Sequence, residues 1–375
     1  MDQTSSSGSP ARPRVLVGGM TENAGGKEAF ILSAFRLLRD SYSFTFLVDR
    51  DAVAHQEELL AAGARIARVP ARRQHPVGYV RAVSRLVRAG GFYAVWLHQT
   101  VISSIEPLVA ARAAGVPVRV LHSHSSANMS GRLSGVLHRI QRPLTGLYAN
   151  RRYACSAEAA QWLFGNAPWT FVPNIFDPAP FSFDADRRAH VRRQLGLHPQ
   201  ERAVIHVARL GPAKNHAFDL RIMEALRAMG VHARLLLCGD GPYREDLAAD
   251  VQRLSLDDMV TFLGPRKDVP DLLQAADVMI LPSTFEGLPY TALEAQAAGL
   301  PLLLSQAVST SAQVGGQVTV LDLAGGAVPW ARAIASLDPR AHLARPNAVK
   351  GSPFDAGAAL PRFQGLLAAD APRES

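Results

Sequence analysis

The sequence has few cysteines and no long apolar run, which excludes several classes of protein. Its 375 residues include only two cysteines, Cys155 and Cys238, too few for a disulfide framework and without the spacing of a metal site. Each ends an apolar, strand-like run, so we interpret both as reduced, buried thiols of a cytoplasmic protein. No apolar run approaches the roughly 20 residues of a membrane-spanning helix. Residues 1–13 lack the apolar core of a secretory signal, and we expect a disordered tail there.

The sequence also lacks a dinucleotide-binding signature and a nucleic-acid-binding signature. The glycine fingerprint G-x-G-x-x-G does not follow the first apolar run, "RVLVGG", and this argues against a nicotinamide-dependent oxidoreductase. No basic run is interleaved with aromatic residues, as nucleic-acid-binding proteins often show. The function must therefore be sought in motifs of another kind.

Positive charge is unevenly distributed along the chain. Residues 1–180 contain 20 Lys and Arg against 11 Asp and Glu, whereas residues 181–375 contain 20 against 21. The excess positive charge of the first half could bind an anionic membrane surface or an anionic substrate. Nucleic acid is the weakest of the three interpretations. In "YVRAVSRLVRAGG", Arg81, Arg85 and Arg88 recur at helical spacing among apolar residues. This pattern suits a helix on a membrane surface, although the solvated face of a core-packed helix also explains it.

Apolar runs and helical patterns alternate twice along the chain. The first half begins with "RVLVGG" and the helical pattern of "GKEAFILSAFRLLRD", and the second half restarts at "AVIHVARL". The apolar runs are rich in valine without alternation, as in parallel strands buried on both faces. We therefore predict an α/β protein of two doubly wound, Rossmann-like domains, residues 14–180 and 181–355. Residues 356–375 are expected to form a helix that crosses back to the first domain. Sites in such folds lie at the carboxyl ends of strands, so we expect one in the cleft between the domains.

Two cations follow the first strand of the second half. In "HVARLGPAKNH", Arg209 and Lys214 belong to a strand-to-helix loop. A guanidinium fork and an ammonium point charge, five residues apart at the carboxyl end of a strand, suit a diphosphate. Surface cations without a ligand are the alternative interpretation.

A second loop of the same half combines two carboxylates with the start of a helix. In "STFEGLPYTALEAQAAGLP", a helix that begins at Pro289 leaves its first backbone amides, with those of Gly287 and Leu288, free to bind an anion. Glu286 and Glu294 would repel a phosphate there unless they bind something else. Sugar hydroxyls fit, because one carboxylate can accept hydrogen bonds from two neighbouring hydroxyl groups. A diphosphate between two sugar rings, as in a nucleotide-sugar, has this layout.

These residues resemble the donor site of retaining GT-B glycosyltransferases, specifically glycosyltransferase family 4 (group 1). The similarity rests on Arg209, Lys214, "EGLP" and Glu294, and it extends to "GDGPYREDL" and "FLGPRKDVPDLLQAADV". By this resemblance Glu286 would hold hydroxyls of the transferred sugar, and Glu294 would hold the ribose. The implied fold is GT-B, with two Rossmann-like domains facing across a cleft.

The resemblance implies further residues around the donor. Gly239 begins the "GDGPYREDL" stretch, and the loop from Leu263 to Arg266 would approach the nucleobase. In "TENAGGKEAFILSAF", Gly25 and Gly26 are similar to the family's glycine-rich loop after the first strand. They would let the backbone approach the donor diphosphate or the acceptor.

Histidines end two apolar runs of the first half. His122 and His124 in "VRVLHSHSSAN" alternate onto one face and are expected to point into the cleft, and His98 ends "YAVWLH". In the family, a histidine in this position lies close to the sugar and the reacting centre. Which of His122 and His124 it is stays open. His-x-His could also suggest a metal, but no third ligand is recognised nearby, so no metal site is expected.

The resemblance implies an enzyme that moves a sugar from a nucleotide-sugar and retains its anomeric configuration. Uridine diphosphate is the default carrier, and guanosine diphosphate is the alternative. Arg209, Lys214 and the helix end would stabilise the leaving diphosphate, so no metal is expected, and no Asp-x-Asp sequence is identified as a metal site. The stretches "GGMTENAGG", "HSHSSAN" and "LLSQAVS" are most like bacterial capsular and exopolysaccharide members. A lipid-linked saccharide acceptor at the inner face of the cytoplasmic membrane would follow, and would explain the basic first domain.

Other functions stay open from the sequence alone. A sugar-nucleotide 2-epimerase or a storage-polysaccharide synthase could use the same fold, and the epimerase would change its sugar without an acceptor. A non-catalytic scaffold of a polysaccharide assembly complex could hold a membrane through the basic half. Four donor-site residues argue against a scaffold: Arg209, Lys214, Glu286 and Glu294. The transferred sugar, the acceptor, the linkage and the oligomeric state cannot be predicted from the sequence.

Overall fold

The chain folds into two compact units. The structure is a computed structural model that describes residues 11–23, 25–125, 132–286, 288–315, 317–338 and 346–368. The first unit comprises Met1–Pro173 and Ala359–Ser375, and the second comprises Asn174–Ala358. The first unit therefore ends before the predicted boundary at residue 180. Residues 1–10 of the predicted tail and 369–375 of the predicted last helix lie outside the described residues.

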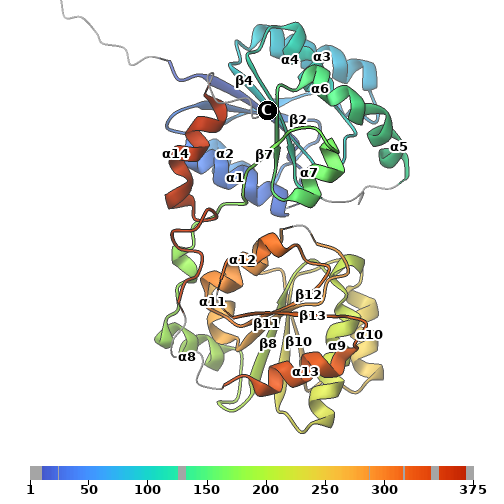
Figure 1. The fold of residues 1–375 in the computed structure, drawn as a ribbon, viewed down its shortest axis with the longest axis vertical. Helices are drawn as coiled ribbons and strands as arrows, with labels where there is room; N and C mark the ends of the chain where they lie inside the picture. Colours follow the sequence, from blue (N-terminus) through green and yellow to red (C-terminus); the bar gives the residue numbers. More distant parts are fainter. Residues whose placement is uncertain are drawn as a thin grey trace, which may run out of the picture. The chain divides into compact units, whose positions relative to one another are not determined.

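A seven-stranded parallel sheet forms the centre of the first unit, in the order β3-β2-β1-β4-β5-β6-β7 (Figure 1). Its strands are β1 (Arg14–Gly18), β2 (Ser43–Val48), β3 (Arg65–Arg68), β4 (Ala94–Gln99), β5 (Val118–Ser123), β6 (Arg151–Ala154) and β7 (Thr170–Phe171). Its helices are α1 (Gly26–Leu38), α2 (Gln56–Ala61), α3 (Pro76–Ala89), α4 (Glu106–Ala113), α5 (Arg132–Gln141), the 3-10 helix η1 (Arg142–Leu144), α6 (Thr145–Tyr148) and α7 (Ala157–Phe164). The strand order changes direction between β1 and β4, and such a switch point is where α/β sheets bind ligands.

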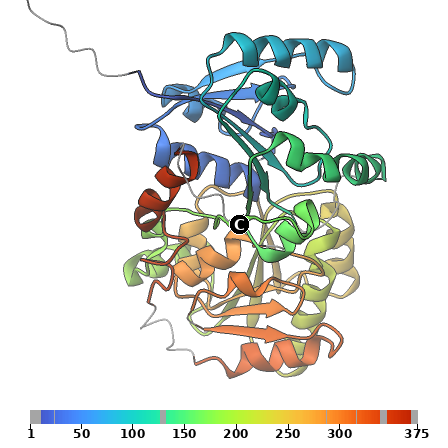
Figure 2. The same cartoon turned by 45° about the horizontal axis from the view of Figure 1, so that its top comes forward.

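Burial on both faces explains the valine-rich strands of this sheet. All six residues of β4 are buried, and right-handed crossovers place α1 and α2 on one face and α3 to α7 on the other. The last helix, α14 (Ala356–Leu367), covers the first of these faces. Phe363 of α14 lies 6.1 Å from Phe30 of α1 between ring centroids, and the hydroxyl of Tyr153 donates a 2.6 Å hydrogen bond to the carbonyl of Leu366. Figures 1 and 2 both show α14 beside α1.

The second unit repeats this architecture around six parallel strands in the order β10-β9-β8-β11-β12-β13. Its strands are β8 (Arg202–Val207), β9 (Ala233–Cys238), β10 (Val260–Gly264), β11 (Val278–Leu281), β12 (Leu302–Ser305) and β13 (Val318–Leu321). Its helices are α8 (Ala185–Gln194), α9 (His216–Ala228), α10 (Arg244–Arg253), α11 (Val269–Ala275), α12 (Tyr290–Ala297) and α13 (Ala327–Ser336), with 3-10 helices η2 (Ala179–Phe181), η3 (Pro212–Lys214) and η4 (Thr310–Ala312). The prediction of two doubly wound parallel sheets is confirmed.

A buried ion-pair network attaches α8 to the sheet of the second unit. Asp277, just before β11, accepts hydrogen bonds from Arg188 (2.5 Å), Arg192 (3.2 Å) and the backbone amide of Ala203 (2.8 Å). Both arginines are at least nine-tenths buried. Burial alone would raise the pKa of Asp277, but Arg188, the Ala203 amide and Arg192 outweigh it and lower that pKa. The charged carboxylate therefore holds two buried guanidinium groups in place.

Both cysteines are free and buried, as predicted. Burial raises the pKa of Cys155 to about 12 and that of Cys238 to about 11, so neither is a reactive thiolate near neutral pH. Among the helices of the described residues, none combines the length and apolar character needed to cross a bilayer.

Candidate functional site

Two loops of the second unit meet at the carboxyl ends of the neighbouring strands β8 and β11. The amide of Thr284 donates to the carbonyl of Ala213 (2.9 Å), and the side-chain amide of Asn215 donates to the carbonyl of Pro282 (2.9 Å). Asn215 adopts a left-handed conformation at φ 59° to make this turn into α9. The loop with Arg209 and Lys214 is thereby fixed against the loop with Glu286.

This contact brings together two of the predicted site residues. The ammonium of Lys214 forms an ion pair with the carboxylate of Glu286, and burial lowers the pKa of Lys214 to about 8. Arg209 is exposed, and none of its side-chain atoms forms a hydrogen bond or ion pair within the part of the chain that the structure describes. The site therefore offers one cation paired to a carboxylate and one that is available to an anion.

The helix predicted at Pro289 begins one residue later. Pro289 is the N-cap of α12, and no side chain caps this end, so the first amides of the helix are open to an anion. Leu288 is buried, and its carbonyl accepts a 3.0 Å hydrogen bond from Asn174. Gly287, predicted to belong to this anion site, lies outside the described residues.

The electrostatics of the two glutamates explain how a diphosphate could lie near them. The charge of Glu286 is compensated by Lys214. Glu294 lies in the second turn of α12, and burial raises its pKa to about 7, so a large fraction of this carboxyl group is protonated at neutral pH. The two carboxyl groups therefore add much less than two negative charges to the site, while both keep oxygen atoms that can bind hydroxyl groups.

Gly239 supports the Arg209 loop by close backbone packing. It has φ +143°, and a Cβ atom there would lie 1.9 Å from the carbonyl oxygen of Ala208. Next to it, the amide of Leu210 donates a 3.0 Å hydrogen bond to the carbonyl of Asp240. Only glycine allows the loops after β8 and β9 to approach this closely.

Leu263 and Arg266 lie at the edge of the same sheet. Leu263 is a half-buried residue of β10, and Arg266 follows this strand. Arg266 forms two hydrogen bonds with Asp268, of 2.7 and 2.5 Å. Within the described residues no hydrogen bond or ion pair connects either one to Lys214 or Glu286, so both lie outside the charged centre of the site.

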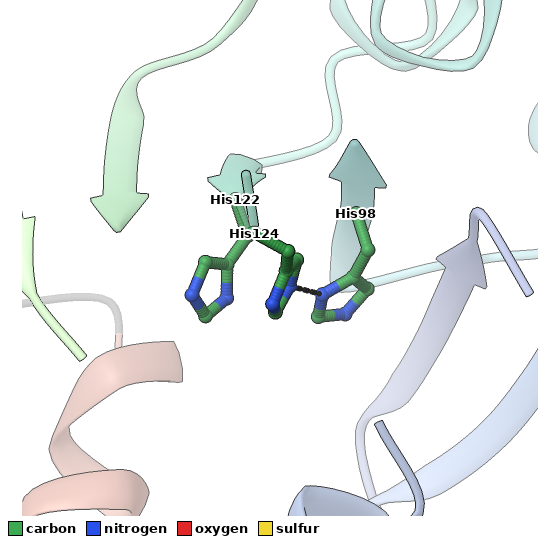
Figure 3. Close-up of side chains that lie close together, drawn as sticks. All are labelled: His98, His122 and His124. Carbon is green, nitrogen blue, oxygen red and sulfur yellow. Dashed lines mark hydrogen bonds between the residues drawn. The ribbon is translucent and has the colours of Figure 1, made fainter. Parts of the chain in front are cut away.

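Three histidines meet in the first unit, at the carboxyl ends of β4 and β5 (Figure 3). His98 is opposite His122 in the register of the two strands, and Nδ1 of His98 lies 2.9 Å from Nε2 of His124. The rings of His122 and His124 stack with centroids 4.2 Å apart. Figure 3 shows the three rings side by side, and Phe30 packs edge-on against His122 at 4.7 Å.

Two expectations about these histidines are wrong. First, a third candidate ligand does exist, because ring nitrogens of His98, His122 and His124 all lie within 4.8 Å of one another. The pairing of β4 with β5 brings His98 there across the sheet. Second, His122 does not point into a cleft: it is 0% exposed, and both of its ring nitrogens lack a hydrogen-bond partner. Phe30 and Trp96 cover it, and His124 is the partly exposed member.

The three imidazoles are neutral near pH 7. Burial lowers the pKa of His122 to about 3 and lowers the pKa values of His98 and His124 well below the usual value. Neutral imidazoles can donate or accept a hydrogen bond, but they add no positive charge that could stabilise a diphosphate. Their possible contributions are proton transfer and the orientation of hydroxyl groups.

Gly25 and Gly26 lie at the start of α1, beside a polar cavity of the first unit. Gly25 is the N-cap of α1 and Gly26 its first residue. Lys27 donates a hydrogen bond to the carbonyl of Gly19, and Glu28 accepts one of 2.7 Å from the hydroxyl of Thr21. A cavity of about 260 Å³ opens here, lined by side chains that include Lys27, Asp49, Arg50, Arg72, Arg73 and His98.

Comparison with known proteins identifies the family. Residues 187–319 match the family model described as "Glycosyl transferases group 1". The chain is 33% identical to EpsF of Bacillus subtilis (strain 168), a protein named as a glycosyltransferase, over 328 residues that cover 84% of each protein. The chain belongs to the group 1 glycosyltransferases.

One further relative and one solved structure extend this comparison. An Escherichia coli protein named UDP-Gal:alpha-D-GlcNAc-diphosphoundecaprenol alpha-1,3-galactosyltransferase is 31% identical to this glycosyltransferase over 137 residues, 36% of this chain and 35% of that one. The crystal structure of Anabaena HepE in complex with UDP and glucose matches with a TM-score of 0.78 at 18% identity, covering 95% of this chain and 99% of that one. The predicted GT-B fold is confirmed.

A buried triad beneath the Arg209 loop was not predicted for this glycosyltransferase. Asp219 of α9 accepts hydrogen bonds from His206 (2.7 Å) and His216 (3.0 Å), and all three side chains are buried. His216 also lies 3.4 Å from the carbonyl of Arg209. The "KNH" sequence that begins at Lys214 contains this signal, since a buried histidine that begins a helix needs a polar partner. The triad ties the loop of Arg209 to β8 and α9.

The sequence also contains two Asp-x-Asp spacings that were not identified, at Asp49 and Asp51 and at Asp184 and Asp186. Asp184 is the N-cap of α8 and accepts a 2.9 Å hydrogen bond from the amide of Arg187. Its position at a helix start before the first strand of the second unit gives it a capping function.

Proposed function

We propose that this glycosyltransferase moves a sugar, with retention of configuration, from a UDP-sugar to a lipid-linked saccharide acceptor during exopolysaccharide or capsule assembly. The observation that carries the donor part is the ion pair of Lys214 with Glu286, which precedes the uncapped start of α12. Arg209 is exposed in the same loop as Lys214. Related proteins support the carrier and the acceptor class, because HepE is described in complex with UDP and the E. coli relative is named for a diphosphoundecaprenol-linked acceptor.

The roles of the donor residues follow from their charges. Arg209 and Lys214 bind the diphosphate, together with the open amides of α12. Glu286 accepts hydrogen bonds from hydroxyls of the transferred sugar, and Glu294 accepts them from the ribose. When the bond from the sugar to the diphosphate breaks, negative charge grows on the leaving oxygen, and the two cations stabilise it. The acceptor hydroxyl loses its proton to that leaving phosphate, which permits attack from the same face.

The polar cavity of the first unit is our candidate for the acceptor. A volume of about 260 Å³ is enough for one sugar ring with part of a second group. Its arginine and lysine side chains suit hydroxyls and phosphate oxygens, and neutral His98 in its wall can orient a hydroxyl group. The proposed acceptor therefore binds at the carboxyl ends of β1, β2 and β4.

Product analysis tests this function. The protein is incubated with a panel of UDP-sugars and a polyprenyl-diphosphate-linked saccharide, with and without EDTA, and products are separated by chromatography and analysed by NMR. We expect a longer lipid-linked product with the donor's anomeric configuration, and the same rate with EDTA. A changed free nucleotide-sugar without transfer would identify an epimerase. Inertness towards every donor would favour a scaffold.

The pKa of Lys214 makes UDP binding depend on pH. Because burial lowers this pKa from 10.5 to about 8, the ammonium is charged at pH 7 and mostly neutral at pH 9. We expect the affinity for UDP to fall as the pH rises, by up to about tenfold between pH 7 and pH 9. Lys214→Arg stays charged and should remove this part of the dependence. Calorimetric titration of both proteins measures it, and equal pH profiles would contradict the proposal.

A further inference from the structure

The outward-facing apolar side chains of the first unit are concentrated on one helical layer. Among the described residues of this unit, all the large hydrophobic side chains that are exposed lie on this layer, with the exception of Leu60. They belong to α3, α4, α5, η1 and α6, and are Val77, Val80, Val109, Leu133, Val136, Ile140, Leu144 and Leu147. Single exposed hydrophobic residues are normal, but such a concentration marks an interaction surface.

The helix α5 is amphipathic, but it exposes its apolar side, whereas an ordinary surface helix buries it. Its inner side carries His138, which is 3% exposed and stacks on Trp162 of α7 at 4.2 Å between ring centroids. Its outer side carries Leu133 and Ile140, which are 74% and 60% exposed. A helix of a globular protein normally turns its apolar stripe to the core. The stripe of α5 is therefore available to a partner.

The apolar stripe continues beyond α5 and joins neighbouring helices. Its members follow one another at three- and four-residue spacings, the helical repeat: Leu133, Val136, Ile140, Leu144 and Leu147. Helix α4 packs against both α3 and α6, and Arg112 of α4 donates a hydrogen bond to the carbonyl of Leu147. Figure 1 shows α3, α4 and α6 next to one another. The exposed valines of α3 and α4 thus belong to the same layer.

The charges of this layer select the partner. Residues 76–89 and 132–148 contain no aspartate or glutamate. Their exposed cations include Arg81, Arg85 and Arg88 of α3 and Arg139 of α5. The remaining helix of the layer, α4, adds one carboxylate, Glu106, which is paired with Arg72. An apolar stripe beside cations, with this one compensated carboxylate, suits a bilayer with anionic headgroups. A second copy of the same face would instead bring arginines against arginines.

We propose that this layer is a docking face for an anionic lipid bilayer. Leu133, Val136, Ile140, Leu144 and Leu147 enter the boundary of the acyl chains, and the arginines contact the headgroup phosphates. The helix predicted to lie on a membrane, α3, contributes less to this face than α5. Val83 and Val87 of α3 pack in the core, so only its outer side is free to contact lipid. The docking face rests on the proposed function in one respect, since a lipid-linked acceptor gives the enzyme a reason to reach a bilayer.

Vesicle flotation tests the docking face. Wild-type protein should float with phosphatidylcholine vesicles that contain phosphatidylglycerol, and much less with phosphatidylcholine alone. The triple variant Val136→Ser, Ile140→Ser, Leu147→Ser should bind anionic vesicles at least about tenfold more weakly. The matched control replaces three exposed hydrophobic residues elsewhere, Leu60→Ser, Met229→Ser and Val328→Ser, and should bind like the wild type.

Three results would overturn the docking face. They are absent binding of the wild type, equal binding of the triple variant, and a wild-type dimer that the triple variant converts to a monomer in light scattering. UDP affinity is measured on the same samples. Loss of vesicle binding with unchanged UDP affinity supports docking, because it shows that the variant is folded. Vesicle binding without any UDP binding would contradict the proposed function and leave the docking face intact.

Discussion

Replacing Glu286 with alanine is expected to lower kcat for sugar transfer by about 10²- to 10³-fold and to leave UDP affinity unchanged or higher. The carboxylate is assigned to hydroxyls of the transferred sugar, and the loss of one such positioned group typically has an effect of this size. In the free protein Glu286 is paired with Lys214. Its removal therefore gives the diphosphate a cation without a competing carboxylate.

The measurement combines steady-state transfer with calorimetric titration of UDP. Glu286→Gln keeps the shape and some hydrogen bonding, and should lie between the wild type and the alanine variant. Glu224→Ala, at an exposed position of α9, is the control and should be unaffected in both assays. A loss of UDP affinity as large as the loss of transfer would show that Glu286 does not act on the sugar.

Replacing Asp277 with alanine is expected to lower the free energy of unfolding of the second unit by about 3–5 kcal/mol, because it leaves two buried guanidinium groups without their counter-ion. Arg188 and Arg192 have no other acidic partner among the described residues, although backbone carbonyls of α11 accept further hydrogen bonds from them. The carbonyls cannot compensate two buried positive charges. We therefore expect α8 to detach from the sheet.

Urea unfolding followed by circular dichroism measures this effect. The control is Asp250→Ala, which breaks an exposed pair with Arg253 on α10 and should change stability by less than about 1 kcal/mol. If Asp277→Ala proves too unstable to purify, Asp277→Asn keeps the packing and should still be destabilised. Equal stability of the Asp277 and Asp250 variants would contradict the ion-pair account.

Local patterns in the sequence were sufficient to predict the fold and to select two residues that the structure brings together, Lys214 and Glu286. Periodicity gave the buried parallel strands, and the helix at residues 26–38 is where the apolar spacing placed it. The pairing of the Lys214 loop with the Glu286 loop follows from the rule that carboxyl ends of parallel strands share one edge. Lys214 and Glu286 were selected as candidate site residues from the spacing of motifs within two short segments of the sequence.

Features that depend on distant neighbours could not be predicted in this way. His98 joins His122 and His124 only through the register of β4 and β5. The raised pKa of Glu294 depends on how deeply α12 is buried, which no local sequence reports. The outward stripe of α5 has the periodicity of an ordinary core-facing helix, so the sequence cannot show that its apolar side faces away from the core.

Thermal denaturation with UDP, GDP, ADP, dTDP and NAD, each in large excess, tests the donor site most directly. A ligand at about 100 times its dissociation constant stabilises the folded state by roughly 2.7 kcal/mol, enough to raise Tm by several degrees. We expect such a rise with UDP, and a much smaller one in the Arg209→Ala variant. A rise with NAD alone would contradict a nucleotide-sugar site at Arg209, Lys214 and Glu286.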